Sequence, residues 1–271
     1  MTASEKQTLA QFLDTAADSL RDGYHRDHGQ YDFSNDAITP VSNTTATDPP
    51  PSTSYPPSDS LAAISAEIHT CTRCQLCKTR KNVVPGEGVD HPLVLVIGEG
   101  PGADEDATGR PFVGPAGQLL DRMLDSKGQI GLYRNKNCFI ANTVKCRPPG
   151  NRDPLPEETA ACAPFLERQI AALNPKIILC VGRVAAHIML KNEESMGALR
   201  GKFFDFHRTV DSIPPNQRFD STLHPIPLLA TYHPSALLRN EDYKKPAWED
   251  LKMLRAKLIE LVPEFAAAEK N

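Results

Sequence analysis

The sequence lacks long apolar runs. No stretch approaches the roughly eighteen consecutive apolar residues that a membrane-spanning helix requires. The N-terminal stretch, residues 1–23, also lacks the basic segment followed by an apolar segment that marks a secreted protein. We therefore expect a cytoplasmic protein that has no membrane partner.

Cysteine is scarce by the standard of disulfide-rich proteins. The 271 residues include 7 cysteines, and without a secretion signal this number does not favour a disulfide framework. Their spacing is uneven, because Cys71, Cys74 and Cys77 lie within one short segment. Such clustering indicates metal binding, whereas Cys180 lies in an apolar run and is expected in the core.

Acidic side chains are concentrated at the N-terminal end. Residues 1–60 hold nine acidic and three basic side chains, although the whole chain has a net charge of only −4. The rest of the chain is therefore mildly basic, which is compatible with a polyanionic partner such as a nucleic acid.

Residues 1–59 differ in composition from the rest of the chain. Residues 5–24 have apolar positions at helical spacing, and residues 25–59 are rich in Pro, Ser, Thr, Asp and Asn. The second composition cannot bury enough apolar surface to offset the loss of chain entropy, so it predicts a disordered linker. The leading helix is either a docking segment for an unidentified protein or only marginally stable. We expect one folded domain over residues 60–271.

From residue 60 onward, helical patterns alternate with short apolar strands. Strands are expected over 92–98, 137–144, 176–182 and 226–233, and helices over 60–71, 115–126, 156–173, 183–190 and 247–262. This alternation predicts an α/β fold with three layers, α/β/α, around a central, mostly parallel four-stranded sheet. Ligands in such folds bind at the carboxyl ends of the strands.

The segment "GEGPGADEDATGRPFVG", residues 98–114, includes the end of the first strand. Its glycine spacing resembles that of a dinucleotide-binding loop, but acidic residues at 104–106 would repel a phosphate, and the next helical pattern begins only at Pro115. We therefore reject a phosphate site. Glu99 at the strand end and the ring of Phe112 suit a flat ligand, although Phe112 fits a loop anchor in the core equally well.

Two further candidates follow other strands. Asn142 lies at the end of the second strand, and its amide offers the donor and acceptor pair that can read the edge of a nucleobase. His233 follows the fourth strand in "TYHPSALLR". Each residue by itself also fits a structural role, but parallel strands would bring both to the sheet edge where Glu99 lies.

A four-cysteine metal site is the simplest account of the cysteine pattern. Cys71 and Cys74 have the spacing with which two thiolates hold one centre, and Cys146 and Cys162 are best placed to complete the set. Four thiolates suit either zinc or a 4Fe–4S cluster, and the residues alone do not choose between them. Cys77 extends the pattern toward a ferredoxin-type run, but the cysteine followed by proline that completes such a run is missing.

Seven segments appear in order within about residues 65–262. They are "CTRCQL", "VIGEGPGADEDATGRPFVGPAGQLLDRML", "NTVKCRPPGNRDPLPEE", "AAC", "VGRVAAHIML", "LRGKFF" and "YHPSALLR". Together they resemble the family 4 uracil-DNA glycosylases, the iron–sulfur type, and the long second segment is the most specific of them. Residues 1–60 fall outside the resemblance.

The resemblance implies a set of functional residues. It implies a 4Fe–4S cluster held by Cys71, Cys74, Cys146 and Cys162, with Cys77 as an extra thiol. It also implies a uracil pocket lined by six residues: Glu99, Gly100, Pro101, Phe112, Asn142 and His233. Phe112 would then stack on the base, Asn142 would reject cytosine at the pyrimidine edge, and His233 would donate to the O2 side of the leaving uracil.

The group that holds the attacking water is less clearly marked. Gly100 stands where the cluster-free uracil glycosylases have an aspartate, so that Glu99 or the loop backbone must hold the water here. Glu99 and His233 are therefore the candidate catalytic residues.

The activity implied is hydrolysis of the N-glycosidic bond of deoxyuridine in DNA, as a step of base excision repair. Arg200, Lys202 and Arg239 are candidate contacts to the phosphates of single- or double-stranded DNA. Leu237 or Leu238 is a candidate wedge, although helix packing explains these leucines slightly better. We expect a monomer. The alternative function is a non-enzymatic nucleic-acid-binding module in which the four cysteines hold structural zinc.

Overall fold

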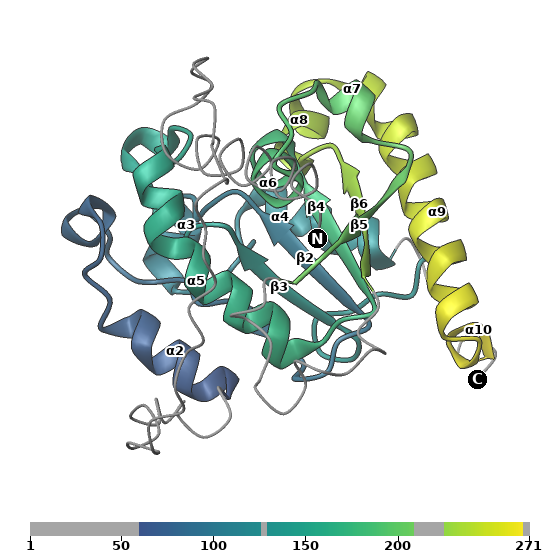
Figure 1. Cartoon of the computed structure of the whole chain (residues 1–271). Helices are drawn as coiled ribbons and strands as arrows, with labels where there is room; N and C mark the ends of the chain where they lie inside the picture. The colour runs from purple at the N-terminus through teal and green to yellow at the C-terminus, as the bar shows by residue number, and fades with distance from the viewer. Residues whose placement is uncertain (1–59, 126–128, 209–224, 268–271) are drawn as a thin grey trace, which may run out of the picture. The chain divides into compact units, whose positions relative to one another are not determined.

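The computed structural model describes residues 60–125, 129–208 and 225–267, and its centre is a six-stranded sheet (Figure 1). The strands are β1 (Glu87–Gly88), β2 (Val94–Gly98), β3 (Cys138–Asn142), β4 (Ile177–Val181), β5 (Phe203–Phe206) and β6 (Ile226–Thr231). Their order across the sheet is β1-β3-β2-β4-β6-β5. The four central strands are parallel, and β1 and β5 are antiparallel to their neighbours.

The prediction of a mostly parallel α/β sheet is confirmed, but the expected number of four strands is wrong. The two additional strands are the edges of the sheet. β1 has only two residues, which is too few for a periodic pattern, and the four residues of β5 are half-buried or exposed. Neither has the continuous apolar run that identifies the central strands in the sequence.

Helices cover both faces of the sheet. Along β2, Val94 and Val96 pack into one core, and Leu95 and Ile97 pack into the other. The first core includes residues of α4 (Pro115–Asp125) and α9 (Lys244–Leu261), and the second includes residues of α5 (Pro156–Leu173) and α6 (Arg183–Leu190). In Figure 1, α5 and α9 lie on opposite sides of the sheet. The three-layer prediction is therefore confirmed.

A third, smaller core joins the start of the domain to α5. In it, Ile64 and Ile68 of α2 (Leu61–His69) pack with Phe165 of α5. This packing brings the cysteine segment after α2 beside the middle of α5. The remaining helical segments are short: η1 (Gln75–Lys78), α3 (Ala103–Thr108), η3 (Pro149–Asn151), α7 (Met196–Leu199), α8 (Pro234–Arg239), η5 (Glu241–Tyr243) and α10 (Glu264–Ala267).

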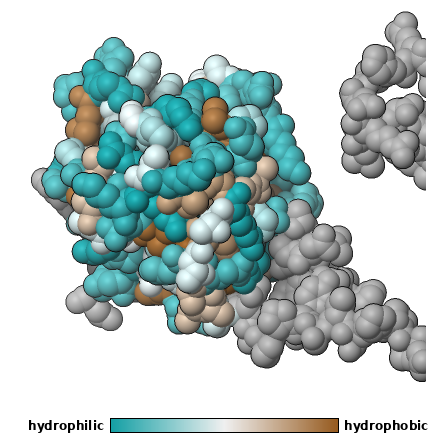
Figure 2. Space-filling view, turned by 90° about the vertical axis from the view of Figure 1, so that its left-hand side faces the viewer, coloured by the Kyte–Doolittle hydropathy of each residue, from teal (hydrophilic) through white to brown (hydrophobic). Residues whose placement is uncertain are grey.

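The surface of the domain is mainly hydrophilic where Figure 2 shows it, and hydrophobic residues form small separate areas there. The large hydrophobic side chains that are exposed in the described ranges are Leu155, Leu238 and Leu261. Within the same ranges, no helix is both long and apolar enough to cross a membrane. The helix expected over 5–24 and the linker expected over 25–59 lie outside the described residues.

Candidate active site

A pocket of about 550 Å³ opens at the carboxyl ends of the four parallel strands. Glu99 follows β2 and Asn142 is the last residue of β3. Arg183 is the first residue of α6, just after β4, and His233 follows β6. β3 and β4 flank β2 on opposite sides, so the chain reverses its direction of travel across the sheet at this point. Ligands of open α/β sheets bind at such a crevice, and the position of the pocket agrees with that rule.

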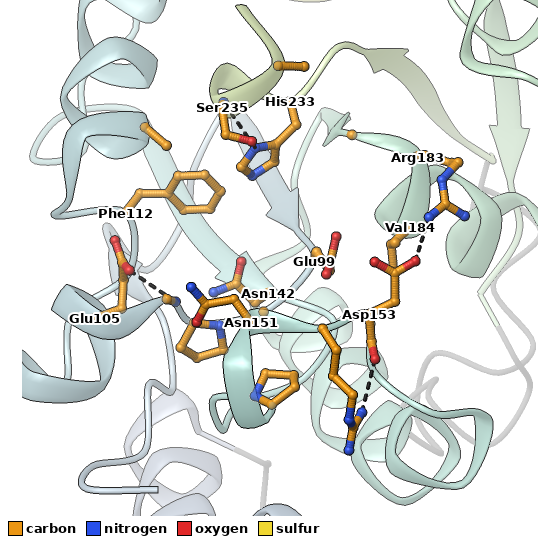
Figure 3. Close-up of a pocket in the computed structure, with 18 of the residues that line it drawn as sticks. Glu99, Glu105, Phe112, Asn142, Asn151, Asp153, Arg183, Val184, His233 and Ser235 are labelled. Atoms are coloured by element: carbon orange, nitrogen blue, oxygen red, sulfur yellow. Dashed lines mark hydrogen bonds and ion pairs between the residues drawn. The ribbon is translucent and has the colours of Figure 1, made fainter. Parts of the chain in front are cut away.

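The structure brings all six predicted pocket residues together. The lining includes Glu99, Gly100, Pro101, Phe112, Asn142 and His233, and also Arg239. In Figure 3, the rings of Phe112 and His233 and the side chains of Asn142 and Glu99 lie around one cavity. The centroids of the two rings are 5.7 Å apart.

Phe112 is held in an unusual backbone conformation. Its φ is +52°, in the left-handed region that residues with a Cβ rarely adopt. Arg134 donates hydrogen bonds of 2.6 Å to the carbonyl oxygens of both Pro111 and Phe112. At Gly117, a Cβ atom would lie 1.9 Å from the same Phe112 carbonyl oxygen. The hydrogen bonds from Arg134 therefore fix the loop that presents the ring. Gly117, which has no side chain, lets this loop pack directly against α4.

Glu105 is a second anchor of this loop, and the sequence analysis missed it. Its carboxylate accepts hydrogen bonds from the backbone N–H groups of Gly102 (3.0 Å), Val113 (2.8 Å) and Gly114 (3.0 Å). The prediction that the next helix begins only at Pro115 is wrong, because α3 begins directly after Gly102. The available signal was a glutamate at the third position of a helix, where a capping box places it.

The start of α3 does not restore a phosphate site. The Glu105 carboxylate already occupies the Gly102 N–H at the helix start, and Asp104 and Asp106 lie in the same turn. A bound phosphate would meet this negative charge. A dinucleotide site is therefore still rejected, but the reason is the negative charge at the start of α3 and not a late helix start.

Asn142 presents an amide to the pocket from a buried position. The residue is 1% exposed, and its buried Oδ1 atom has no hydrogen-bond partner among the residues that the structure describes. The same Oδ1 lies near Gly98 on β2, where a Cβ atom would come within 2.5 Å of both Oδ1 and the Phe112 ring. A buried acceptor without a partner costs free energy in the unliganded protein, and a ligand that donates to it recovers that cost.

The imidazole of His233 is neutral, and its protonation is set by its neighbours. Nδ1 accepts a hydrogen bond of 3.2 Å from the Ser235 backbone N–H and lies 2.8 Å from the Ser235 hydroxyl. Because a backbone N–H can only donate, the ring proton is placed on Nε2. Burial, and secondarily the charge of Arg239, lower the pKa of His233 to about 4. The ring therefore offers an Nε2–H donor at neutral pH.

Glu99 has the opposite shift. Burial and the nearby charge of Asp153 raise the pKa of the Glu99 carboxyl to about 7, against a lowering effect of Arg183. Among the described residues, the Glu99 carboxyl has no hydrogen-bond or ion-pair partner, whereas Asp153 and Arg183 form an ion pair at the pocket (Figure 3). The pocket therefore holds one carboxyl group that changes charge near neutral pH.

The loop after β3 supplies pocket residues that the sequence analysis did not select. Asn151, Arg152 and Asp153 all line the pocket, and Arg183 lies opposite them at the start of α6. Asn151 has a φ of +56°, and its Oδ1 accepts a hydrogen bond from Arg147. Arg152 is paired with the buried Glu158. Asn151, Arg152 and Asp153 lie in the sequence between Cys146 and Cys162. This position could have indicated that their loop lies beside the pocket and contributes side chains to it.

Two predicted DNA contacts lie away from this pocket. Arg200 donates to both carboxylate oxygens of the fully buried Asp250, which also accepts from Thr231 Oγ1. This arrangement gives Arg200 a structural role. Lys202 is exposed beside the Phe204 ring. Contact of Arg200 or Lys202 with phosphate stays a prediction.

The third predicted DNA contact, Arg239, reaches the pocket and is exposed. It ends α8, the helix that also carries both wedge candidates. Leu237 is buried, as expected for helix packing, whereas Leu238 is 52% exposed. Of the two candidates, Leu238 is therefore the one available to a partner.

A second cavity is lined by five cysteines: Cys71, Cys74, Cys77, Cys146 and Cys162. Arg80 Nη1 donates to Cys146 Sγ over 3.1 Å, and the Lys145 backbone N–H donates to Cys162 Sγ over 3.3 Å. Arg73, Arg80 and Lys145 also line the cavity. Donors and cations around thiol sulfurs suit an anionic metal–thiolate centre.

The side chains as they stand do not form a finished metal site. In the described part of the chain, no group of three or more His, Cys, Asp or Glu side chains has the arrangement of one. The four predicted ligands nevertheless share one cavity, and the chemistry of the donor set fits a cluster. Cys180 is fully buried in β4 and belongs to the core, as the sequence predicted.

Comparison with known proteins identifies the family. The model of the uracil DNA glycosylase superfamily matches residues 85–252, which contain the whole pocket lining described above. The type-4 uracil-DNA glycosylase of Saccharolobus solfataricus is 40% identical over 204 residues, 74% of this chain and 87% of that protein. The type-4 enzyme of Thermotoga maritima is 37% identical over 205 residues, 74% of this chain and 96% of that protein.

A type-5 relative is more distant. The type-5 uracil-DNA glycosylase of Thermus thermophilus is 30% identical over 159 residues, 46% of this chain and 71% of that protein. The similarity to the type-4 proteins is both higher and longer. This chain therefore belongs to the uracil DNA glycosylase superfamily, in its type-4 branch.

Proposed function

We propose that this protein is a uracil-DNA glycosylase. It would bind a deoxyuridine that has left the DNA stack, hydrolyse the N-glycosidic bond, release uracil and leave an abasic site, as a step of base excision repair. The observation that carries the proposal is the Oδ1 atom of Asn142 beside the ring of Phe112 at the sheet edge, which is buried and has no hydrogen-bond partner within the described ranges. The family and its type-4 members support it.

Base recognition follows from the chemistry of one amide and one ring. The N3–H of uracil can donate to Asn142 Oδ1, and the amide N–H₂ can donate to uracil O4. Cytosine presents an acceptor at N3 and a donor at N4, so the same amide would leave buried polar groups unpaired. Phe112 stacks on the base plane, and its constrained loop keeps the ring in place without cost at the moment of binding.

His233 stabilises the leaving group. Uracil leaves as an anion, and negative charge develops on O2 as the glycosidic bond breaks. The imidazole can donate its Nε2–H to O2 as a hydrogen bond from an uncharged ring, because a pKa of about 4 leaves His233 neutral at neutral pH. Ser235 holds Nδ1 on the other side and so orients the ring.

Glu99 is the best candidate to hold the attacking water. Three carboxylates line the pocket, and two of them are occupied: Glu105 accepts from three backbone N–H groups, and Asp153 pairs with Arg183. Ionised Glu99 can accept a hydrogen bond from water and stabilise the positive charge that develops on the sugar. Above pH 7 this carboxyl is mostly ionised.

We further propose that Cys71, Cys74, Cys146 and Cys162 hold a 4Fe–4S cluster, with Cys77 as an extra thiol. The cluster would cross-link the segment after α2 to Cys146, which follows β3, and to Cys162 in α5, so that the loop carrying Asn151 and Asp153 is tied at both ends. No observation on the described residues favours the zinc-binding, non-enzymatic alternative.

The proposed substrate is DNA, single- or double-stranded. Arg239 lies at the pocket where a phosphate next to the extruded nucleotide would pass, and Leu238 beside it is exposed for contact with neighbouring bases. The cytoplasmic location, the monomeric state and the docking role of the N-terminal segment stay predictions.

The activity is tested with a labelled oligonucleotide that contains one uracil, either single-stranded or opposite guanine. We expect the purified holoprotein to produce alkali-sensitive strand breaks at the uracil and none at a cytosine in the same position. Absence of cleavage on both uracil substrates would end the proposal.

A matched pair of variants assigns the recognition to the pocket. We expect Asn142→Asp to lower the rate by about 10-fold or more and to weaken discrimination against cytosine, because the donor to uracil O4 is lost. Asn192→Asp is the control, since Asn192 lies outside the pocket and its Oδ1 only accepts from the Glu194 N–H. Full rate and selectivity in Asn142→Asp would remove Asn142 from the pocket chemistry.

A further inference from the structure

Lys145 is a fully enclosed lysine that lies between Asn142 of the candidate active-site pocket and the cysteine cavity. Its side chain is 1% exposed, and its ammonium donates to the Asn142 carbonyl oxygen over 2.9 Å and to Gln169 Oε1 over 2.7 Å. Among the described residues, no carboxylate pairs with it. Its backbone N–H donates to Cys162 Sγ, and the residue lines the cysteine cavity. One residue thus contacts both the base-reading strand and the cysteines.

The hydrogen bond from Lys145 satisfies the Asn142 carbonyl oxygen at the end of β3, where the pairing with β1 has already ended. β3 ends at Asn142, and on its outer side β1 pairs only with Phe139 and Ile140. The ladder to β2 continues through the neighbouring residue, since the Thr143 N–H donates to the Gly98 carbonyl. The Asn142 carbonyl is buried, so it needs a donor, and Lys145 is that donor.

Gln169 holds the ammonium from the other side. Its Oε1 accepts from Lys145, and its Nε2 donates to the Pro85 carbonyl over 2.8 Å. Gln169 is itself 2% exposed and belongs to α5. The chain from Pro85 through Gln169 and Lys145 to Asn142 therefore ties the end of β3 to the helix that carries Cys162.

We infer that Lys145 is a positioning residue for Asn142. It fixes the backbone from which the Asn142 amide reaches the base, and so sets the geometry of base reading from outside the pocket. A cation is suited to this place because the cysteine cavity on its other side would hold an anionic thiolate centre, and a buried charge needs an opposite one. This inference rests on the proposed uracil-DNA glycosylase function.

A double-mutant cycle in the full-length holoprotein tests the inference. The variants are Lys145→Met, Asn142→Ala and the two combined, measured by single-turnover excision of uracil with enzyme in excess. We expect Lys145→Met alone to lower the maximal single-turnover rate by about 10-fold or more, with the enzyme concentration that gives half of this rate within about twofold, because a small misplacement of a reading group slows the chemical step. In the Asn142→Ala background, the same change should alter the rate by less than about twofold.

The controls separate a positioning role from loss of fold. Iron content and the melting temperature are measured for every variant, and Lys252→Met on the surface of α9 is the matched control. If Lys145→Met does not fold, Gln169→Leu replaces it in the same cycle, since it removes the other acceptor that holds the ammonium.

The outcomes are distinct. An equal loss of rate in both backgrounds, or an unchanged maximal single-turnover rate in folded Lys145→Met, would overturn the positioning role. If the wild-type protein itself excises no uracil, the proposed function has failed rather than the inference about Lys145.

Discussion

Burial has opposite consequences for two ionisable residues of the pocket. It raises the pKa of Glu99 to about 7 and lowers the pKa of His233 to about 4. At pH 8 the carboxyl is therefore ionised while the imidazole is neutral, and at pH 5.5 both are uncharged. His233 therefore has the neutral state that its proposed role needs throughout this range, whereas Glu99 has the ionised state that attracts water only above about pH 7.

The pH dependence of excision follows from this pair. We expect the single-turnover rate to rise through one ionisation near pH 7 and to show no further step down to about pH 5.5, because His233 does not titrate there. Glu99→Gln should be slower by about 10-fold or more at pH 8, and its profile should be flat. The measurement is a rate profile from pH 5.5 to 9 for both proteins. An unchanged rise in Glu99→Gln would assign the ionisation to another group.

The same shift predicts a stability effect with a definite sign. The folded protein holds the Glu99 proton up to about pH 7, whereas an unfolded glutamate loses it near pH 4.5, so the Glu99 contribution weakens the fold as pH rises through this window. Glu99→Gln removes that cost. We expect it to raise the free energy of unfolding at pH 8 by about 1–2 kcal/mol, a value reduced for solvent screening of this partly exposed group.

Urea unfolding of Glu99→Gln and wild type at pH 8 and pH 5.5 measures this effect. The gain should shrink at the lower pH, where both side chains are neutral. A variant that is less stable than wild type at pH 8 would contradict the desolvation cost assigned to Glu99. Together with the rate profile, a gain in stability with a loss of rate would mark Glu99 as a residue kept for function.

The cysteine ligands can be assigned one residue at a time. Cys77 lines the same cavity as the four proposed ligands, but the resemblance to the family 4 enzymes does not assign it as a cluster ligand. We expect Cys77→Ala to keep its iron and visible absorbance, and Cys74→Ala to lose most of both, because a 4Fe–4S cluster takes four thiolates. Loss of iron in Cys77→Ala with retention in Cys74→Ala would exchange their roles.

At the scale of elements, the loop between β2 and α4 is a rigid unit rather than a flexible lid. Glu105 from α3 and Arg134 from the segment before β3 hold its backbone from two sides, and α4 passes directly beneath Phe112. The ring is therefore presented by three elements at once. Such preorganisation removes an entropic cost from base binding.

Two glycine variants test this view of the loop. At Gly117 in α4 a Cβ atom would lie 1.9 Å from the Phe112 carbonyl oxygen, whereas at Gly197 in α7 the nearest atom is Ser195 Oγ at 3.8 Å. We expect Gly117→Ala to cost about 1–3 kcal/mol of stability and to slow excision, since Phe112 must move. Gly197→Ala should be neutral or gain up to about 1 kcal/mol from helix propensity.

Chemical denaturation and single-turnover rates of the two variants provide the measurement. Equal behaviour of Gly117→Ala and Gly197→Ala would show that the α4 contact does not hold the loop. A loss of stability in Gly117→Ala without any loss of rate would separate the fold of the loop from its role in presenting Phe112.

At the scale of the whole domain, the proposed cluster joins segments that are distant in the sequence. It would link the region after α2, at Cys71 and Cys74, to Cys146 and Cys162 on either side of a pocket loop. The apolar contact between α2 and α5 is small, because it rests on few residues such as Ile64, Ile68 and Phe165. A cross-link that closes so long a loop stabilises mainly this region.

Removal of the iron should therefore loosen the N-terminal part of the domain and the pocket loop together. We expect iron-depleted protein to lose about 2 kcal/mol or more of stability, which corresponds to a melting temperature lower by about 4–8 °C, and to become sensitive to proteolysis between residues 71 and 162. Calorimetry and mapping of the cleavage sites measure both effects. An unchanged melting temperature and cleavage pattern would contradict the cross-linking role.

Much of this architecture is encoded in local sequence patterns. Continuous apolar runs identify β2, β3, β4 and β6 because strands buried on both faces consist almost entirely of apolar residues, and helical periodicity identifies α4, α5, α6 and α9. Glu99, Asn142 and His233 could be selected because each stands at the end of such a strand, where parallel strands place their ligand-binding residues.

Other features depend on contacts between distant parts of the chain, and local sequence patterns do not predict them. The edge strands β1 and β5 are stabilised by pairing with β3 and β6, and α3 starts where the Glu105 side chain caps it. None of these three elements has a strong sequence pattern of its own. Arg200 is paired with Asp250, fifty positions further along the chain, which a basic motif does not reveal.

The same distinction applies inside the pocket. The strand-end positions of Glu99, Asn142 and His233 in the sequence were enough to predict which kinds of side chain gather at the sheet edge. Only the folded structure set their protonation and freedom, because burial shifts the pKa values of Glu99 and His233, and contacts with Arg134, Glu105 and Lys145 hold Phe112 and Asn142 in place. Those effects depend on atoms brought close by folding, and spacing along the chain does not contain them.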